Sequence, residues 1–250
     1  MTCYLLPIEN PEARYTLHVL RFNPETDEKP YWRSYQVPFV STMTVIEALE
    51  YLWDQGEYIA FRTNCREFTC GSCAMLINGK PQLACDTILQ DDMRLEPLSR
   101  YGVLRDLVVD TEAIKKKLKD VKYWPVSANR EKNFTVPPQV IDAYGQIYSR
   151  CIECACCLEA CPASFNEASR FDGPMYALLL ARAANHPLDA MNRIQQASER
   201  GIWACVSCFE CADVCPLDLS PAKEVAKFRR KAITQSLKRP FTFRKDKRYE

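Results

Sequence analysis

The sequence predicts an α+β protein of two domains, a mostly β domain at residues 1–105 and a helical domain at residues 106–250. Three observations lead to this division. Short segments of the first hundred residues alternate apolar and polar side chains, as half-buried strands do. From about Val103 the apolar residues recur at helical spacing instead. Each half also contains its own group of cysteines.

Five segments of the first domain are expected to be strands. They are residues 15–22, 35–40, 74–77, 81–84 and 94–98. The second is expected to pair with the first. Asn78-Gly79 predicts a tight turn that joins the third and fourth segments into a hairpin. Pro81 restricts the fourth to a short strand or to the edge of a sheet, because proline lacks the N–H that a central strand needs.

Helices are predicted in both halves. Thr44 and Glu47 form a capping box ahead of an apolar helical face made of Val45, Leu49, Leu52 and Trp53. In the second half, helical spacing is found at Leu104, Leu107, Val108 and Ile114. Further helices are expected after Pro137-Pro138, where residues 140–148 carry an apolar face, and at residues 174–184 and 188–199.

The composition is that of a globular protein with an unusual number of cysteines. Of 250 residues, 47 % are apolar and 26 % are charged, and a net charge of +1 gives no reason to expect a nucleic-acid partner. The N-terminus lacks the basic-then-apolar pattern of a secretory signal, and disulfide scaffolds are usually much shorter chains. Fourteen cysteines in such a chain therefore indicate metal or redox chemistry.

No segment is expected to cross a membrane. The most apolar stretch, residues 175–181, ends at Arg182, whereas a bilayer span needs about 20 apolar residues. If the protein works at a membrane, another subunit must hold it there.

The first group of cysteines consists of Cys65, Cys70, Cys73 and Cys85. Its spacing, C-x4-C-x2-C with a fourth cysteine after the predicted hairpin, is that of a plant-type [2Fe–2S] site. Gly71 allows the tight turn that brings backbone N–H groups near the sulfurs. The alternative is a structural zinc site, but such sites usually use two knuckles of closely spaced cysteines, and Cys73 with Cys85 does not form one.

Two further runs share the bacterial ferredoxin spacing C-x2-C-x2-C-x3-C-P. They are Cys151, Cys154, Cys157 and Cys161 followed by Pro162, and Cys205, Cys208, Cys211 and Cys215 followed by Pro216. In two-cluster ferredoxins the fourth cysteine of each run serves the other cluster. The expected ligand sets are therefore Cys151, Cys154, Cys157 and Cys215 for one cluster, and Cys161, Cys205, Cys208 and Cys211 for the other. Zinc explains neither the doubling nor the two prolines.

Other residues offer little chemistry of their own. Cys3 and Cys156 have no role in these spacings. A structural role is expected for His18, in a predicted strand, and His186 is expected in a loop. No Ser/His/Asp set, paired-carboxylate signal or flavin fingerprint stands out, and seven glycines leave little material for phosphate cradles. The chain is therefore expected to catalyse no reaction of an organic substrate by itself.

The order of these motifs resembles the iron–sulfur subunit of succinate dehydrogenase and fumarate reductase. The stretches that carry the resemblance are residues 62–75, 151–162, 171–174 and 201–216. It implies an N-terminal plant-type-ferredoxin-like (β-grasp) domain and a bacterial-ferredoxin-like helical domain. It also implies a subunit that relays electrons between the FAD of a catalytic flavoprotein and a quinone or membrane-anchor subunit, in a quinone-linked oxidoreductase. Such a subunit lies peripherally on the membrane, and the cytoplasmic face is expected.

Two features depart from the family's usual pattern. Members usually have an apolar residue where this chain has Cys208, and bind a [3Fe–4S] centre there. Cys208 makes a fourth ligand available, so a second [4Fe–4S] cluster is favoured, and a [3Fe–4S] cluster with unligated Cys208 is the alternative. Residues 163–166 stand where many members have adjacent tryptophans beside the quinone. Because these tryptophans are missing, a cysteine-rich anchor subunit is considered beside the usual cytochrome b type.

Two other classes of protein compete with this interpretation. One is the iron–sulfur subunit of another flavoprotein oxidoreductase, of the glycerol-phosphate, glycolate or heterodisulfide reductase type, which the additional Cys208 slightly favours. The other is a scaffold held together by zinc, which iron analysis would exclude.

Overall fold

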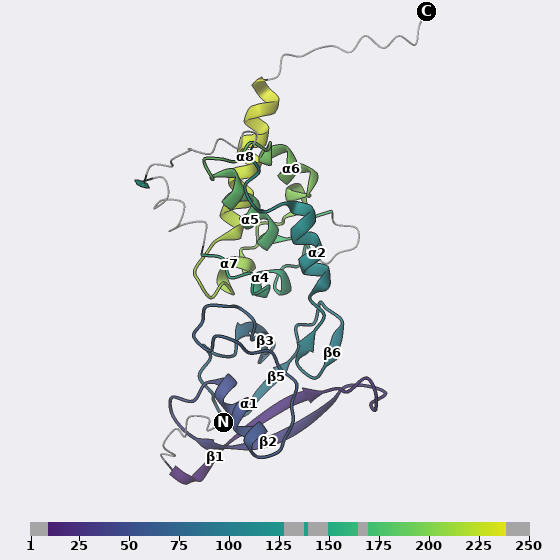
Figure 1. Cartoon of the computed structure of the whole chain (residues 1–250), viewed down its shortest axis with the longest axis vertical. Coiled ribbons are helices and arrows are strands. Elements are labelled where there is room, and N and C mark those ends of the chain that lie inside the picture. Colours follow the sequence, from purple (N-terminus) through teal and green to yellow (C-terminus); the bar gives the residue numbers. More distant parts are fainter. Residues whose placement is uncertain (1–9, 128–137, 140–149, 165–169, 239–250) are drawn as a thin grey trace, which may run out of the picture.

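The protein folds into a β-rich half and a helical half that lie end to end (Figure 1). The computed structural model describes residues 10–127, 138–139, 150–164 and 170–238. The apolar face expected at residues 140–148 lies outside the described residues, and so does Cys3. The α+β fold class predicted from the sequence is confirmed.

A mixed five-stranded sheet forms the N-terminal half, with the strand order β2-β1-β5-β3-β4. Its strands are β1 (Asn10–Arg21), β2 (Tyr31–Phe39), β3 (Ala74–Ile77), β4 (Lys80–Leu83) and β5 (Met93–Glu96). All neighbouring pairs are antiparallel except β1 and β5, which run parallel. The hairpin and the pairing of the first two strands are as predicted, and β4 is a short edge strand, as Pro81 requires.

Helix α1 (Val45–Asp54) joins β2 to β3 and covers the sheet core. The predicted capping box is present, because Glu47 N–H donates to Thr44 Oγ1 and the Glu47 carboxylate accepts from Thr44 N–H. The helix buries Val45, Leu49 and Leu52, while Trp53 remains partly exposed and donates from its indole to the Ile59 carbonyl. This sheet order with one helix after the second strand is the β-grasp arrangement.

The segment after residue 102 corrects one prediction. Helical spacing was expected from Val103, but the chain forms a small hairpin, β6 (Val103–Arg105) with β7 (Val108–Val109). Asp106 at its turn explains why, since its 2 % exposed carboxylate accepts from Arg21 Nε at 2.8 Å, from Phe22 N–H and from Ala60 N–H. These long-range bonds outweigh local helical periodicity.

Helices make up the second half. They are α2 (Glu112–Val121), α4 (Cys156–Glu159), α5 (Pro174–Ala184), α6 (Arg193–Glu199), α7 (Glu210–Asp213), α8 (Pro221–Lys238) and the 3-10 helix η1 (Ile202–Ala204). Helix α5 has the predicted bounds and is buried along almost its whole length between α2, α6 and α8. Helix α6 begins later than expected, at Arg193, because the 2 % exposed guanidinium of this residue pairs with Asp189 and binds the carbonyls of Lys122 and Trp124.

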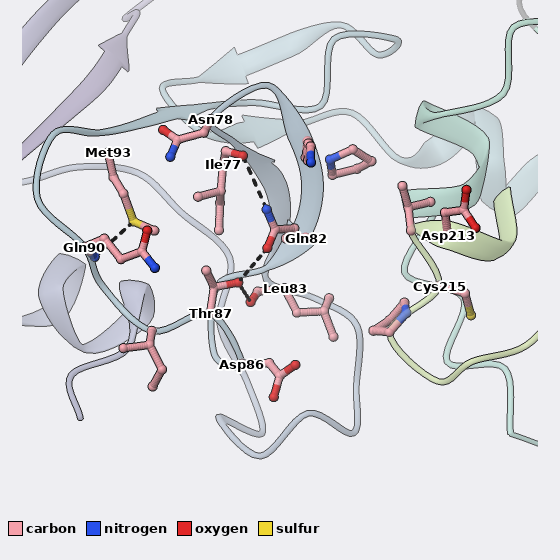
Figure 2. Close-up of a pocket in the computed structure, with 15 residues that line it drawn as sticks. Ile77, Asn78, Gln82, Leu83, Asp86, Thr87, Gln90, Met93, Asp213 and Cys215 are labelled. Atoms are coloured by element: carbon pink, nitrogen blue, oxygen red, sulfur yellow. Dashed lines mark hydrogen bonds between the residues drawn. The ribbon is translucent and has the colours of Figure 1, made fainter. Parts of the chain in front are cut away.

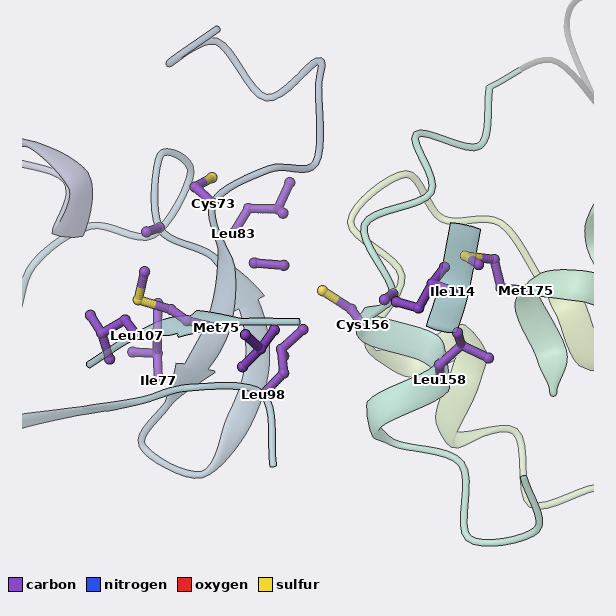
Figure 3. Close-up of a cluster of buried hydrophobic side chains, with 14 of the residues drawn as sticks. Cys73, Met75, Ile77, Leu83, Leu98, Leu107, Ile114, Cys156, Leu158 and Met175 are labelled. Carbon is purple, nitrogen blue, oxygen red and sulfur yellow. The ribbon is translucent and has the colours of Figure 1, made fainter. Parts of the chain in front are cut away.

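The two halves share one hydrophobic core. A single cluster of buried side chains runs from Leu17 in the sheet to Phe228 in α8. Figure 3 shows Met75 and Leu98 on the sheet side and Cys156 and Leu158 on the helical side of this cluster. The expected boundary at residue 105 falls inside the β6–β7 hairpin, which hydrogen-bonds to the N-terminal half, and the first helix of the second half starts at Glu112.

Helices of membrane-spanning length and apolarity do not occur in the part of the chain that the structure describes.

Replacing Asp106 should destabilise the N-terminal half strongly. Asp106→Ala leaves Arg21 buried without its carboxylate and frees two backbone N–H groups, and breaking a buried pair in this way costs about 3–5 kcal/mol. Urea unfolding followed by fluorescence measures the loss. The matched control is Asp92→Ala, which removes the exposed partner of His18 and should cost about 1 kcal/mol or less. Equal losses for the two variants would contradict the expectation.

Candidate metal-cluster sites

The first cysteine site lies on the loop between α1 and β3 and at the end of the β3–β4 hairpin. Cys73 directly precedes β3, and Cys85 follows β4 after one residue. The hairpin brings these two cysteines together, with their Sγ atoms 3.4 Å apart. Cys65 and Cys70 come from the loop of residues 62–73, which we call the N-terminal cysteine loop. The structure thus gathers the residues that the plant-type spacing singled out.

Backbone N–H groups in this loop point at sulfur. The amides of Glu67, Thr69 and Cys70 donate to Cys65 Sγ at 3.3–3.4 Å. Such bonds require an unusually folded backbone, and Arg66 and Phe68 have φ values of 57° and 59°. N–H groups directed at sulfur stabilise the charged thiolate, the form that binds metal.

The acidities of two thiols in this site diverge. Burial alone would raise the pKa of Cys70, but hydrogen bonds from Ser72 and contacts with Cys65 outweigh it and lower the pKa to about 6. Burial and the adjacent Cys85 raise the pKa of Cys73 to about 12. Only a cation or a metal cluster makes the ionised form of Cys73 favourable at neutral pH.

Two cavities in the helical half are each walled by four cysteines. Cavity 1 is lined by Cys151, Cys154, Cys157 and Cys215, together with Pro216 and Pro221. Cavity 2 is lined by Cys161, Cys205, Cys208 and Cys211, together with Phe171 and Pro174. Both cavities are small and similar in size. Each cavity takes three cysteines from one run and the fourth from the other, which is the exchange that the spacing predicts.

The two runs fold alike at the backbone level. In the first run Glu153 and Ala155, on either side of Cys154, have φ values of 57° and 68°. In the second run Ser207 and Phe209, on either side of Cys208, have the same values, 57° and 68°. A one-turn helix follows in both, α4 and α7. Cys208 therefore occupies the position in its loop that Cys154 occupies in the other.

Burial disfavours the ionised form of several thiols that line these cavities. Burial raises the pKa of Cys151 and of Cys211 to about 11, and raises the pKa of Cys157 as well. In each case neighbouring cysteines add to the shift, because several thiolates would repel one another. A cluster of iron and sulfide that takes several thiolates at once would relieve both costs.

The donor set fits iron–sulfur clusters better than single ions. Among the described residues no three His, Cys, Asp or Glu side chains converge tightly enough to hold one metal ion. A zinc ion would draw its four sulfurs to about 2.3 Å from one point. Four thiols that surround a small cavity instead of converging on one point suit a cluster, and cysteine thiolates are the usual ligands of iron–sulfur clusters.

The remaining cysteine and histidine predictions concern residues outside these sites. Cys156 is fully buried and lines neither cavity, and its thiol contacts Cys154. His18 bridges Ser34 and Asp92, so it ties β1 to β2 and to the turn before β5. His186 accepts from Leu188 N–H in the turn after α5. His18 therefore makes contacts of the structural kind expected for it, and His186 lies in a turn, in line with the predicted loop.

The N-terminal cysteine loop packs directly on cavity 1. A Cβ atom placed on Gly71 would lie 2.8 Å from the Ile152 carbonyl oxygen and 2.9 Å from Cys154 Cβ, so only glycine fits at this approach. Cavity 2 is lined by residues of the helical half alone. The first site and the two cavities therefore follow one another as neighbours, from the sheet into the helices.

A groove of about 680 Å³ lies at the surface between the two halves. Figure 2 shows Gln82, Leu83 and Asp86 on its sheet side, facing Asp213 and Cys215 on its helical side. Cys215 thus stands between this groove and cavity 1.

Sequence reasoning missed Glu159 as an interface residue. Its 6 % exposed carboxylate lies on α4 and accepts from Ser99 N–H at 3.0 Å, from the Ser99 hydroxyl and from Arg100 N–H. It therefore fastens the cysteine run of cavity 1 to the N-terminal half. The only signal in the sequence was the position of this acidic residue between two expected ligands, Cys157 and Cys161. A negative charge there does not help to bind a cluster that thiolates already hold.

Comparison with known proteins assigns each half to a family. A model described as a 2Fe-2S iron-sulfur cluster binding domain matches residues 16–116, and one described as a 4Fe-4S dicluster domain matches residues 147–219. The chain is 35 % identical to the fumarate reductase iron-sulfur subunit of Mycobacterium tuberculosis, covering 90 % of this chain and 96 % of that protein.

Two further similarities are informative. An uncharacterised iron-sulfur protein of Methanocaldococcus jannaschii is 40 % identical over 80 % of this chain, but the chain spans only 40 % of that protein. A chain of the Mycobacterium smegmatis Sdh1 complex has a TM-score of 0.80 with 24 % identity, covering 92 % of this chain and 99 % of that one. At this identity the structural match supports the fold.

Substituting Gly71 should weaken the contact between the halves. Gly71→Ala introduces a methyl group against Ile152 and Cys154, and it also strains a residue with φ +69°. The control is Gly79→Ala, because Gly79 has φ +75° but nothing within 4 Å of the added Cβ, so it isolates the backbone strain of about 1–2 kcal/mol. Urea unfolding followed by visible absorption should show a larger loss for Gly71→Ala. Identical unfolding midpoints would argue against close packing at Gly71.

Proposed function

The chain belongs to the family of fumarate reductase and succinate dehydrogenase iron–sulfur subunits, and on this premise we propose that it is the electron-transfer subunit of such a complex. The single observation that supports this most is the succession of three four-cysteine sites, of which the first two are in contact through Gly71.

Each site is proposed to hold one cluster. Cys65, Cys70, Cys73 and Cys85 would hold a [2Fe–2S] cluster. The cysteines of cavity 1 would hold a [4Fe–4S] cluster and those of cavity 2 the third. When bound, the clusters carry single electrons between a flavin and a quinone or anchor partner.

The chain's own residues position these groups and adjust their electronic properties. The N–H groups on Cys65 Sγ, the apolar walls of the cavities and nearby charges are the features through which a protein changes a cluster's reduction potential. Oxidation of succinate or reduction of fumarate is assigned to a flavoprotein partner that contains FAD. The chain itself is therefore proposed to be an oxidoreductase subunit without a substrate site.

A second partner is proposed on the side of cavity 2. The apolar side chains of Trp203, Val206 and Phe209 are exposed there, from 43 to 65 %, around the exposed Cys208. Exposed apolar groups clustered at a redox site favour a protein contact. We assign this face to a membrane-anchor subunit of the cytochrome b or cysteine-rich type, with a quinone as the electron partner. The chain would then lie peripherally on the cytoplasmic face of the membrane.

The third cluster is proposed to be [4Fe–4S]. Cys208 lines cavity 2 and repeats the backbone conformation of Cys154, so its thiol is available as a fourth ligand. With a full complement, the chain should contain about ten iron atoms, and about nine if the third cluster is [3Fe–4S]. Iron and sulfide analysis of the anaerobically purified complex, together with co-purification of an FAD flavoprotein, tests the proposal. A colourless protein that contains zinc would overturn it.

The isolated chain should show no turnover of succinate or fumarate. Every recognisable reactive group in the proposed sites is a cysteine assigned to a cluster, and the dicarboxylate site is assigned to the flavoprotein. Adding the flavoprotein should restore reduction of an artificial electron acceptor by succinate. Turnover by the purified chain alone, with flavoprotein excluded by mass spectrometry, would refute the division of roles.

Replacing Cys208 should change the type of the third cluster. Cys208→Val removes one thiolate, so a [3Fe–4S] signal should appear in the electron paramagnetic resonance (EPR) spectrum of the oxidised, anaerobically prepared complex, with loss of about one iron per chain. The control is Cys156→Ala, a cysteine of the other run that lines neither cavity, and it should leave the signal of the third cluster unchanged. A strong [3Fe–4S] signal already present in the anaerobic native complex after added iron would count against Cys208 as a ligand.

A further inference from the structure

A single arginine of α8 binds the loop that carries Cys205 and Cys208. Arg229 Nε donates to the Ile202 carbonyl at 2.9 Å, and Nη2 donates to the Trp203 carbonyl at 3.0 Å and to the Cys205 carbonyl. Nη1 lies 3.4 Å from Ser207 Oγ. One guanidinium therefore contacts four of the residues from 202 to 207.

This loop needs such a partner more than an ordinary loop does. The loop follows directly after η1, and its backbone passes through the left-handed residues Ser207 and Phe209. Its carbonyl groups therefore cannot join the regular hydrogen bonds of a helix or a strand. Carbonyl groups without a helical partner must be satisfied by side chains or water. The fixed fork of an arginine serves several acceptors at once, which a lysine cannot do.

Apolar contacts also dock α8 on the rest of the helical half. The helix is anchored by Ala222, Val225 and Phe228, which are all at most 5 % exposed. Arg229 is half-buried and reaches past this apolar contact to the cysteine loop. Its hydrogen bonds therefore act on the loop more than on the position of the helix.

The charge of Arg229 also matters for what cavity 2 binds. A guanidinium remains protonated in proteins. It is hydrogen-bonded to the carbonyl of a cysteine that lines cavity 2. A cluster becomes more negative when it accepts an electron, so a fixed positive charge close by favours the reduced form and raises the reduction potential.

We propose that Arg229 is a positioning residue of the third cluster, with two separable effects. Its fork holds the loop so that Cys205 and Cys208 both face cavity 2, which favours four ligands over three. Its charge raises the reduction potential of the cluster in that cavity relative to an uncharged residue. This inference rests on the proposed function, since it assumes an iron–sulfur cluster in cavity 2.

The test uses three variants of the assembled, anaerobically purified complex. Arg229→Gln removes fork and charge, and Arg229→Lys keeps the charge but not the fork. Arg230→Gln removes the charge of the exposed neighbour on the same helix and is the matched control. Redox titrations followed by EPR give the potential of each cluster, and brief ferricyanide oxidation followed by iron analysis gives the tendency to lose the fourth iron.

Arg229→Gln should lower the potential of the third cluster alone and increase its conversion to the three-iron form. Arg229→Lys should increase that conversion while keeping the potential near that of the native complex. Arg230→Gln should change neither. If the complex with Arg229→Gln does not assemble, Arg229→Lys still tests the fork, because its loss of the fourth iron is measured separately.

Three results would overturn the inference. One is an unchanged potential and unchanged iron loss in both Arg229 variants. Another is an equal shift in Arg230→Gln, which would indicate a general surface-charge effect. The third is an equal shift of all three clusters, which would indicate a loosened fold. A native complex with fewer than three clusters would instead refute the proposed function, so the two failures are distinguishable before any variant is made.

Discussion

The contact between the N-terminal cysteine loop and the wall of cavity 1 is the constraint on which the arrangement of the sites depends. Gly71 lets two backbones meet at a distance that no side chain permits, and Glu159, later in the same cysteine run, accepts from Ser99 of the N-terminal half. Both contacts join the first cysteine run of the helical half to the N-terminal half. The apolar core continues across the same boundary, so the separation of the first two sites is set by packed atoms rather than by a linker.

Features encoded by short segments could be predicted from the sequence. The Asn78-Gly79 hairpin, the Thr44 cap and helix α5 all have local signals, and the cysteine spacings anticipated which thiols share each cavity. The predictions were wrong where contacts between residues far apart in the sequence decide the local structure. Residues 103–109 have helical periodicity but form a hairpin, because the Asp106 carboxylate binds Arg21, Phe22 and Ala60. Glu159 and Arg229 act on backbone groups far away in the sequence, and no spacing announces such contacts.

Without a bound metal group, the cysteine sites lower the free energy of unfolding of the polypeptide. Without a bound group, ionising buried thiols whose pKa values are raised costs free energy, and so does holding the left-handed residues around them. The surrounding structure must therefore hold them in place through the α5 core, the Arg193 network and the shared apolar cluster. Metal binding and folding are expected to be coupled in such a design, since the unfolded chain presents no preformed site.

The exchange of cysteines between the two runs also has a consequence for how the protein is made. Cavity 1 is lined by Cys215 in addition to the first run, so its wall is incomplete until residue 215 has been synthesised. Cavity 2 likewise joins Cys161 to the second run. The N-terminal site has all its cysteines by residue 85 and can mature during synthesis. The cysteines of the two helical sites are complete only at residues 211 and 215, and a chain cut short before residue 211 would complete neither site.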